Sequence, residues 1–275
     1  MSPFRASAPF TQAWKHFRVE RDGGIATVTF DRPDKLNALT FEVYADLRDF
    51  IAELPHRDDT RVVVLRGEGR AFCSGGDVNE IIGATLRMRP DELLSFTRMS
   101  GEVVRAMRES PVPIIAAVHG TAAGAGSVLA LASDFRIMAR SASFAFLFTR
   151  VGLSGADMGA AYLLPRLVGL GRATQLLMLG DSLPAEQAER WGLVSELVDD
   201  GRADETARAI AERLAQGPWQ AYAQTKALLT RELDMSLPGA IELEAMTQAL
   251  LMKGEDYREF HAAFTGKRQP EWQGR

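Results

Sequence analysis

Apolar and polar residues alternate along the first part of the chain with two different periods. Residues 17–33 predict two strands joined by a Gly-Gly turn, because side chains of alternating polarity flank that pair. Residues 40–54 instead carry apolar side chains at helical spacing, with Thr40 in place as the N-cap. Residues 61–67 form an apolar, β-branched run that predicts a short buried strand.

The same alternation continues through the middle of the chain. The pattern predicts a helix over 90–110, a strand over 111–120, a helix of small residues over 124–134, and strands over 135–140 and 143–148. After residue 155, short helical pieces are punctuated by Gly and Pro, and residues 202–266 have a helical pattern almost throughout. We therefore expect an α/β architecture over residues 1–200, followed by a helical C-terminal region over 201–275.

Composition and charge narrow the class of protein. The chain has 275 residues, 46% of them hydrophobic and 25% charged, which allows a large core. The net charge of −4, with acidic and basic residues interspersed, does not suggest nucleic acid as a partner. A single cysteine, Cys73, excludes an internal disulfide framework, and no apolar run is long enough to span a membrane. We expect a cytoplasmic protein without a metal site, because no His, Cys or carboxylate spacing indicates one.

Two of the predicted strands end in glycine-rich turns, at residues 75–77 and 119–126. A residue without a side chain lets a ligand approach the backbone N–H, and the first N–H groups of a helix lack intrahelical partners. Two such groups aimed at one point would hold a carbonyl oxygen that gains negative charge. Close packing of a strand against a helix also requires small residues. Either turn, taken alone, is therefore better explained by packing than by ligand binding.

Five segments of the chain together carry a resemblance to a known family. They are DRPDKLNALT (31–40), GEGRAFCSGGDVNEI (67–81), PVPIIAAVHGTAAGAGSVLALASDFRIMA (111–139), LLPRLVGLGRATQLLMLGDSLPAEQAERWGLVSELV (163–198) and FTGKRQPEW (264–272). In order and spacing they resemble the crotonase family, also called the enoyl-CoA hydratase/isomerase superfamily. The resemblance implies a ClpP-like spiral core of ββα turns over 1–200, which binds acyl-CoA and carries the catalytic residues. It also implies that region 201–275 serves oligomerisation, in a homotrimer or homohexamer, and covers the active site.

The resemblance also implies site residues. The family's shared chemistry is a thioester enolate whose oxygen is held by two main-chain N–H groups, which fall by position on Gly76 and Ala125. Its coenzyme A contacts fall on Lys35, Leu36, Ser74, Gly75, Val78 and, near the C-terminus, on the basic Lys267. The CoA thioester would be the substrate, and no further cofactor is implied.

Two departures from the family pattern bear on the reaction. Hydratases of the family use two glutamates to handle water, and the matching positions here are Val128 and Phe148. Neither side chain can move a proton, so the usual two-glutamate mechanism is excluded at these positions. Together with Tyr162, these two residues are expected to line the acyl pocket.

One carboxylate remains at a suitable place, that of Asp157. Counted back from Arg166, Asp157 matches the aspartate of a P-D-x-G-G segment in several family members, although the preceding loop carries one extra residue. Some of those relatives are enoyl-CoA isomerases with a single acid/base, and others use an aspartate near this point as a nucleophile. The competing role for Asp157 is that of a helix N-cap.

We therefore expect an enzyme that processes an acyl-CoA through a stabilised enolate, by isomerase-type proton transfer through Asp157. The alternatives are hydration or dehydration with this single carboxylate, hydrolysis or dehalogenation of an unusual acyl-CoA, and a non-catalytic acyl-CoA binder. A carboxylate facing Gly76 and Ala125 from a pocket would favour an enzyme, whereas one that caps its own helix would favour the binder.

Overall fold

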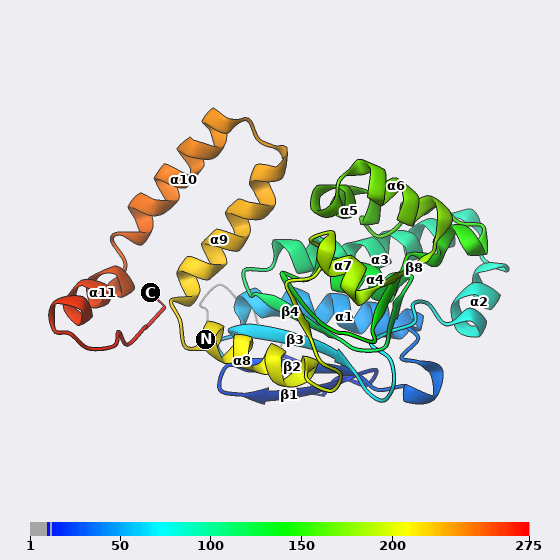
Figure 1. Ribbon diagram of the computed structural model, residues 1–275, viewed down its shortest axis with the longest axis horizontal. Coiled ribbons are helices and arrows are strands. Elements are labelled where there is room, and N and C mark those ends of the chain that lie inside the picture. The colour runs from blue at the N-terminus through cyan, green and yellow to red at the C-terminus, as the bar shows by residue number, and fades with distance from the viewer. Residues whose placement is uncertain (1–9, 12, 275) are drawn as a thin grey trace.

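A six-stranded sheet runs through the body of the protein, which the computed structural model describes over residues 10–11 and 13–274 (Figure 1). In spatial order its strands are β1 (Arg18–Asp22), β2 (Ile25–Phe30), β3 (Val62–Gly67), β4 (Ile114–Val118), β6 (Phe135–Ala139) and β9 (Glu196–Val198). β1 and β2 form the predicted antiparallel hairpin, and the remaining pairs are parallel. β3 and β4 are almost continuously apolar because both faces of the sheet are covered.

A second, smaller sheet starts where the central strand β4 of the first one ends. Its strands are β5 (Thr121–Ala123), β7 (Ser143–Ala145) and β8 (Ser182–Pro184), in the order β5-β7-β8. Gly120 makes the corner between β4 and β5 with a φ of 55°. A Cβ at this position would lie 2.1 Å from the carbonyl oxygen of Arg70, so only glycine fits there.

Helices cover the two faces of the larger sheet. On one face, α1 (Phe41–Glu53), α3 (Pro90–Glu109) and α4 (Ala125–Ala132) enclose the main core. On the other face, α8 (Ala203–Ala215) turns Ala207, Ala211 and Ala215 toward the sheet, and this four-residue spacing places small side chains on one side of the helix. The remaining helices of the body are α2 (Gly83–Thr85), α5 (Ala160–Val168), α6 (Leu170–Leu179) and α7 (Ala185–Arg190), with the short helices η1 (Pro33–Lys35), η2 (Leu54–His56), η3 (Val78–Ile82) and η4 (Leu147–Val151).

The last helices lead away from the body (Figure 1). They are α9 (Trp219–Arg231), η5 (Glu232–Asp234), α10 (Leu237–Leu251) and α11 (Glu255–Thr265). α10 buries none of its residues, although it carries Leu237, Ile241, Met246 and Leu250, which are all more than half exposed. We call α10 and α11 together the C-terminal arm.

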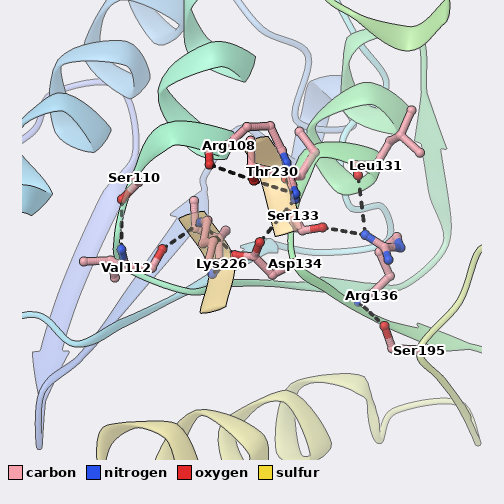
Figure 2. A network of polar contacts seen from close by, with 12 residues as sticks. Arg108, Ser110, Val112, Leu131, Ser133, Asp134, Arg136, Ser195, Lys226 and Thr230 are labelled. Atoms are coloured by element: carbon pink, nitrogen blue, oxygen red, sulfur yellow. Dashed lines mark hydrogen bonds and ion pairs between the residues drawn. The ribbon is translucent and has the colours of Figure 1, made fainter. Parts of the chain in front are cut away.

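A buried ion pair fastens α9 to the body (Figure 2). The Lys226 Nζ lies 2.7 Å from Asp134 Oδ2 and donates a hydrogen bond to the Val112 carbonyl oxygen at 2.9 Å. Arg108 joins the same carboxylate at 3.2 Å and donates to the Thr230 hydroxyl of α9 at 3.1 Å. Burial lowers the pKa of Lys226, and the charge of Asp134 opposes that shift. Asp134 therefore has a structural role.

The predicted α/β core with a helical C-terminal region is confirmed, with local differences. The strand expected over 143–148 ends at Ala145 and gives way to the helical turn η4. The glycine turn at 75–77 leads into the π-helical η3, whose start is fixed because the Asp77 carboxylate accepts hydrogen bonds from the N–H groups of Asn79 and Glu80. Strands β5, β8 and β9 have three residues each, too few for a periodic pattern. The division at residue 200 stays a prediction, and α8, beyond it, packs on the core sheet.

Candidate active site

The two glycine-rich turns of the sequence lie against each other. Short parallel bridges join Leu39 to Gly76 and Cys73 to Ala122. Gly75 has a φ of 96°, and a Cβ on it would lie 2.9 Å from the Ala123 carbonyl oxygen and 3.3 Å from the Ala125 nitrogen. The segment before Gly76 therefore passes directly over the start of α4, and glycine is required for that approach.

Within the part of the chain that the structure describes, the backbone N–H groups of Gly76 and Ala125 donate no hydrogen bond. Ala125 is the first residue of α4, where an N–H has no intrahelical acceptor and the helix dipole is positive. In the bridge between Leu39 and Gly76, the Leu39 N–H donates to the Gly75 carbonyl oxygen, and the Asp77 N–H donates to the Leu39 carbonyl oxygen. The Gly76 N–H takes no part in these bonds. This arrangement suits two oxyanion donors.

Two buried polar residues that sequence reasoning missed hold these turns in place. Asn37, in a left-handed conformation with a φ of 57°, donates from its amide to the carbonyl oxygens of Glu68 and Ala71 at 2.9 and 2.7 Å. Ser127 donates to the Ala122 carbonyl oxygen at 2.6 Å and so ties α4 to β5. For Ser127 the available signal was a polar side chain inside an otherwise apolar segment, and no such signal marks Asn37.

The segments predicted to bind CoA meet beside the first glycine turn. The Ser74 N–H donates to the Leu36 carbonyl oxygen at 2.9 Å, and the Ser74 hydroxyl lies 3.4 Å from the Lys35 carbonyl oxygen. Val78 is 66% exposed at the start of η3, a position open to a flat ring. Lys35 and Leu36 thus lie beside Ser74, and the predicted contacts Gly75 and Val78 follow Ser74 in the chain.

Lys267 lies far from those residues. It follows α11 at one end of the long axis of the molecule, whereas η3 and α2 lie toward the opposite end (Figure 1). Within one chain, the loop that follows α11 therefore lies well away from α2 (Figure 1). A phosphate contact by Lys267 would need a second copy of the chain.

Asp157 sits in a tight turn before α5. The two following residues, Met158 and Gly159, have left-handed φ values of 49° and 85°. The Met158 N–H donates to Asp157 Oδ1 at 2.9 Å, whereas the N-cap of α5 is Gly159, which has no side-chain cap. The carboxylate of Asp157 therefore does not cap its own helix. Burial raises its pKa above the usual range, and the Met158 N–H partly opposes this shift.

Comparisons with known proteins agree with this geometry. A model of the family described as enoyl-CoA hydratase/isomerase matches residues 20–275. The chain belongs to the enoyl-CoA hydratase/isomerase family. It is 38% identical to the 1,2-epoxyphenylacetyl-CoA isomerase of Escherichia coli K12 over 92% of this chain and 96% of that protein. It is 40% identical to a probable enoyl-CoA hydratase of Rhodobacter capsulatus over 94% and 98%. The crystal structure of a putative enoyl-CoA hydratase from Streptomyces coelicolor A3(2) aligns with this chain over the full length of both proteins, with a TM-score of 0.98 and 69% sequence identity.

This enoyl-CoA hydratase/isomerase family member thus has the crotonase fold and is an enzyme of that family. Val128 and Phe148 are buried, with 0% and 8% exposure, in the core cluster that also contains Met158. Tyr162 instead donates its hydroxyl to Asp234 and lies 39% exposed on α5. It borders a pocket of about 270 Å³ that Met158 and Leu163 also line, and its place in the acyl pocket stays a prediction.

The other ionisable groups near the two turns have structural surroundings. Cys73 is fully buried, and burial raises the pKa of its thiol to about 12. The His119 ring binds the Gly69 carbonyl oxygen at 3.0 Å. Among residues 10–11 and 13–274, no group of three His, Cys, Asp or Glu side chains is placed to hold a metal ion. No helix in that same part of the chain is long and apolar enough to cross a membrane.

Proposed function

We propose that this enzyme isomerises an enoyl-CoA thioester, with Asp157 as its single acid/base and the N–H groups of Gly76 and Ala125 as oxyanion donors. The observation that carries the proposal is the Asp157 carboxylate, which is partly buried, does not cap α5 and has a raised pKa. A carboxylate with a raised pKa is protonated more readily than an ordinary aspartate, which suits a group that must both accept and return a proton.

The reaction follows from these groups. Asp157 removes a proton from the α- or γ-carbon of the acyl chain, and the electron pair moves into the thioester carbonyl. The resulting enolate oxygen binds the two N–H groups, one of which lies at the positive end of α4. Asp157 then returns the proton at the other end of the three-carbon unit, and the double bond has moved. No electrons leave the substrate, so the reaction needs no cofactor and no metal.

The names of relatives support two candidate reactions. The Escherichia coli relative is named an isomerase, and so is a trans-2-decenoyl-[acyl-carrier-protein] isomerase of Streptococcus mutans that is 29% identical. Several other relatives are named probable enoyl-CoA hydratases, which favours water addition as the second candidate, with Asp157 as the base. Apolar Val128 and Phe148 at the glutamate positions favour the isomerase. Hydrolysis of an unusual acyl-CoA and simple acyl-CoA binding have less support.

The CoA part of the site is proposed to be completed by a second copy of the chain. Lys35, Leu36, Ser74, Gly75 and Val78 would hold the nucleotide of one copy, and Lys267 would reach its phosphates from a neighbour. The exposed apolar side chains of α10 and α11 support a homotrimer or homohexamer, because such a surface is costly in water. The apolar residues involved include Leu237, Ile241, Leu250, Phe260 and Phe264.

A panel of acyl-CoA thioesters incubated with the protein in D₂O tests the proposal. Mass spectrometry should show deuterium at the α- or γ-carbon of enoyl substrates, together with isomers of unchanged mass apart from that label. A gain of 18 mass units would favour the hydratase, and release of free CoA would favour the hydrolase. Tight binding without any exchange or turnover across the panel would leave the acyl-CoA binder.

A further inference from the structure

Two arginines bind the C-terminal end of α4, the helix whose first residue is one of the two proposed oxyanion donors. Arg136 donates hydrogen bonds to the carbonyl oxygens of Leu131, at 3.4 Å, and of Ser133 (Figure 2). Arg108 donates to the Ala132 carbonyl oxygen, also at 3.4 Å. The last carbonyl groups of a helix have no intrahelical partner and carry its partial negative charge, so cations are favoured there.

Arg136 is a buried cation without a direct counter-charge. Its side chain belongs to a residue with 8% exposure, and its Nε donates to the Leu193 carbonyl oxygen at 2.6 Å. Within the described residues, its guanidinium hydrogen-bonds to carbonyl oxygens and forms no ion pair. Burial lowers the pKa of Arg136 to about 10, an effect that the charge of Asp134 opposes, so the side chain stays protonated at neutral pH. An uncompensated charge in the interior is costly, which calls for a physical reason.

Arg136 lies beside further buried charges whose sum is positive. Arg108 and Lys226 both bind the Asp134 carboxylate, at 3.2 and 2.7 Å (Figure 2). That carboxylate can offset only one of the three cations. We call Arg108, Asp134, Arg136 and Lys226 the α4 charge cluster. Its net positive charge lies at the opposite end of α4 from the two glycine turns.

The interior of the protein carries the effect of this cluster along α4. All eight residues of the helix, Ala125–Ala132, are buried, and at 1.5 Å per residue the helix is about 12 Å long. Charges that interact through buried protein are screened less than charges that interact across water. With an effective dielectric constant near 20, one unit charge at about 12 Å changes an equilibrium that creates an opposite charge by about tenfold.

We infer that Arg136 is a positioning residue for the reaction, which acts from the C-terminal end of α4 to stabilise an enolate oxygen beside the Ala125 N–H. Its guanidinium holds the last turn of the helix and adds positive charge behind the oxyanion donor. The inference rests on the proposed function, because it requires the enolate oxygen to form at the start of α4. Hydrogen bonds to Leu131, Ser133 and Leu193 alone would need only a neutral donor, whereas this role requires the charge.

Enolisation of bound acetoacetyl-CoA tests the inference. This 3-ketoacyl thioester loses a proton to give an enolate with its own near-ultraviolet absorbance, so a pH titration of the complex measures how strongly the site favours a negative oxygen. The wild type should lower the enolisation pKa below that of free acetoacetyl-CoA. Arg136→Gln keeps a hydrogen-bond donor but removes the charge, and it should raise the enolisation pKa by about one unit, a tenfold loss of enolate. Arg136→Lys keeps the charge and should retain most of the effect.

Controls separate the charge of Arg136 from its structural contacts. The affinity for butyryl-CoA, which stays neutral at its carbonyl oxygen, should be the same in Arg136→Gln as in the wild type. Arg140→Gln makes the same change at an exposed arginine just after β6 and should leave the enolisation pKa unchanged, because solvent and salt screen that charge. If Arg136→Gln does not fold, Arg108→Gln decides, since its side chain is 21% exposed and its loss should raise the enolisation pKa in the same direction.

Three results would overturn the inference, and they are distinguishable. An unchanged enolisation pKa in folded Arg136→Gln rejects the role of its charge, and so does an equal rise in Arg136→Lys. Weaker binding of both thioesters by Arg136→Gln, at an unchanged enolisation pKa, shows that Arg136 has a structural role alone. A wild type that binds acetoacetyl-CoA without lowering its enolisation pKa rejects the oxyanion site of the proposed function together with this inference.

Discussion

Gly75 and Ala125 approach so closely that a Cβ on Gly75 would lie 3.3 Å from the Ala125 nitrogen. The contact joins residues 50 positions apart in the sequence and brings the Gly76 N–H beside the start of α4. The helix dipole favours negative charge at the start of α4, and an N–H group of Gly76 aimed at the same point would add to that effect. The first prediction tests whether these groups bind the developing oxyanion.

Replacing Gly76 separates the role of its N–H from the role of its small size. Gly76→Pro removes the N–H and should lower turnover by about 10²-fold or more, the usual cost of losing one oxyanion donor. Gly76→Ala is the control, because its Cβ would lie 3.8 Å from Ile81, in ordinary contact, while the N–H remains. It should keep most of the turnover. Equal rates for both variants, with circular dichroism spectra like that of the wild type, would contradict the assignment.

The Lys226–Asp134 pair should carry much of the attachment of α9. Lys226→Met leaves the Asp134 carboxylate, whose side chain is 16% exposed, without its nearest cation. Breaking a buried pair in this way typically costs about 3–5 kcal/mol, and Arg108 at 3.2 Å should hold the loss near the lower figure. Urea unfolding would measure it, with the exposed Lys253→Met as control. A loss under about 1 kcal/mol would show that the pair is dispensable.

The sequence alone predicts the structural elements that depend on residues close to one another along the chain. The hairpin, the α1 cap and the helices of the C-terminal region all follow from local period and capping chemistry. Thr40, for example, accepts the Val43 N–H at 3.4 Å as its position predicts. The short strands β5, β8 and β9 depend on pairing with distant strands, so no local pattern predicts them.

The candidate site could be predicted only where a family motif marked it. Gly76, Ala125 and Asp157 were predicted through the resemblance, and the structure adds the close approach of the turns. Asn37 was missed because its partner Ala71 lies 34 residues away, so its function depends on a long-range contact.

Hydration of crotonyl-CoA should be slow or absent. Positioned acid–base groups contribute about 10²–10⁴-fold each, and Val128 and Phe148 supply none. Loss of the conjugated-thioester absorbance would follow the reaction. Val128→Glu alone should not restore it, because Phe148 still occupies the second position and a carboxylate at the fully buried residue 128 would be costly. An efficient wild-type rate would mean that another group activates water, and the second candidate function would then take precedence.

Coenzyme A should bind with a salt-dependent contribution from Lys267. Calorimetry with CoA should show weaker binding by Lys267→Ala than by the wild type, and the difference should shrink as salt is raised, because exposed charge pairs are screened. Lys253→Ala, an exposed lysine on the same arm, is the control and should bind normally. No binding at millimolar CoA would contradict the whole CoA site.

Asp157→Asn should abolish exchange of substrate protons with D₂O while the protein stays folded and binds CoA. The amide keeps the size of the side chain and can still accept the Met158 N–H, but it cannot take a proton. The expected loss is about 10²–10⁴-fold. Because burial raises the pKa of Asp157, the acid limb of the wild-type pH–rate profile should lie above the usual aspartate pKa of about 3.9. Asp199→Asn, at an exposed position, should leave the profile unchanged.

The raised pKa of Asp157 also determines how the stability of the protein should change with pH. A carboxyl whose pKa is higher in the native than in the unfolded state stabilises the fold below the unfolded value, and this stabilisation is lost as pH rises through the native value. Asp157→Asn cannot ionise, so it should unfold at the same or a higher temperature than the wild type at pH 7, and the advantage should vanish below about pH 4. Unchanged deuterium exchange in this variant would reject Asp157 as the acid/base. Lower thermal stability at pH 7 together with lost exchange would instead make its carboxylate a structural group of the turn before α5.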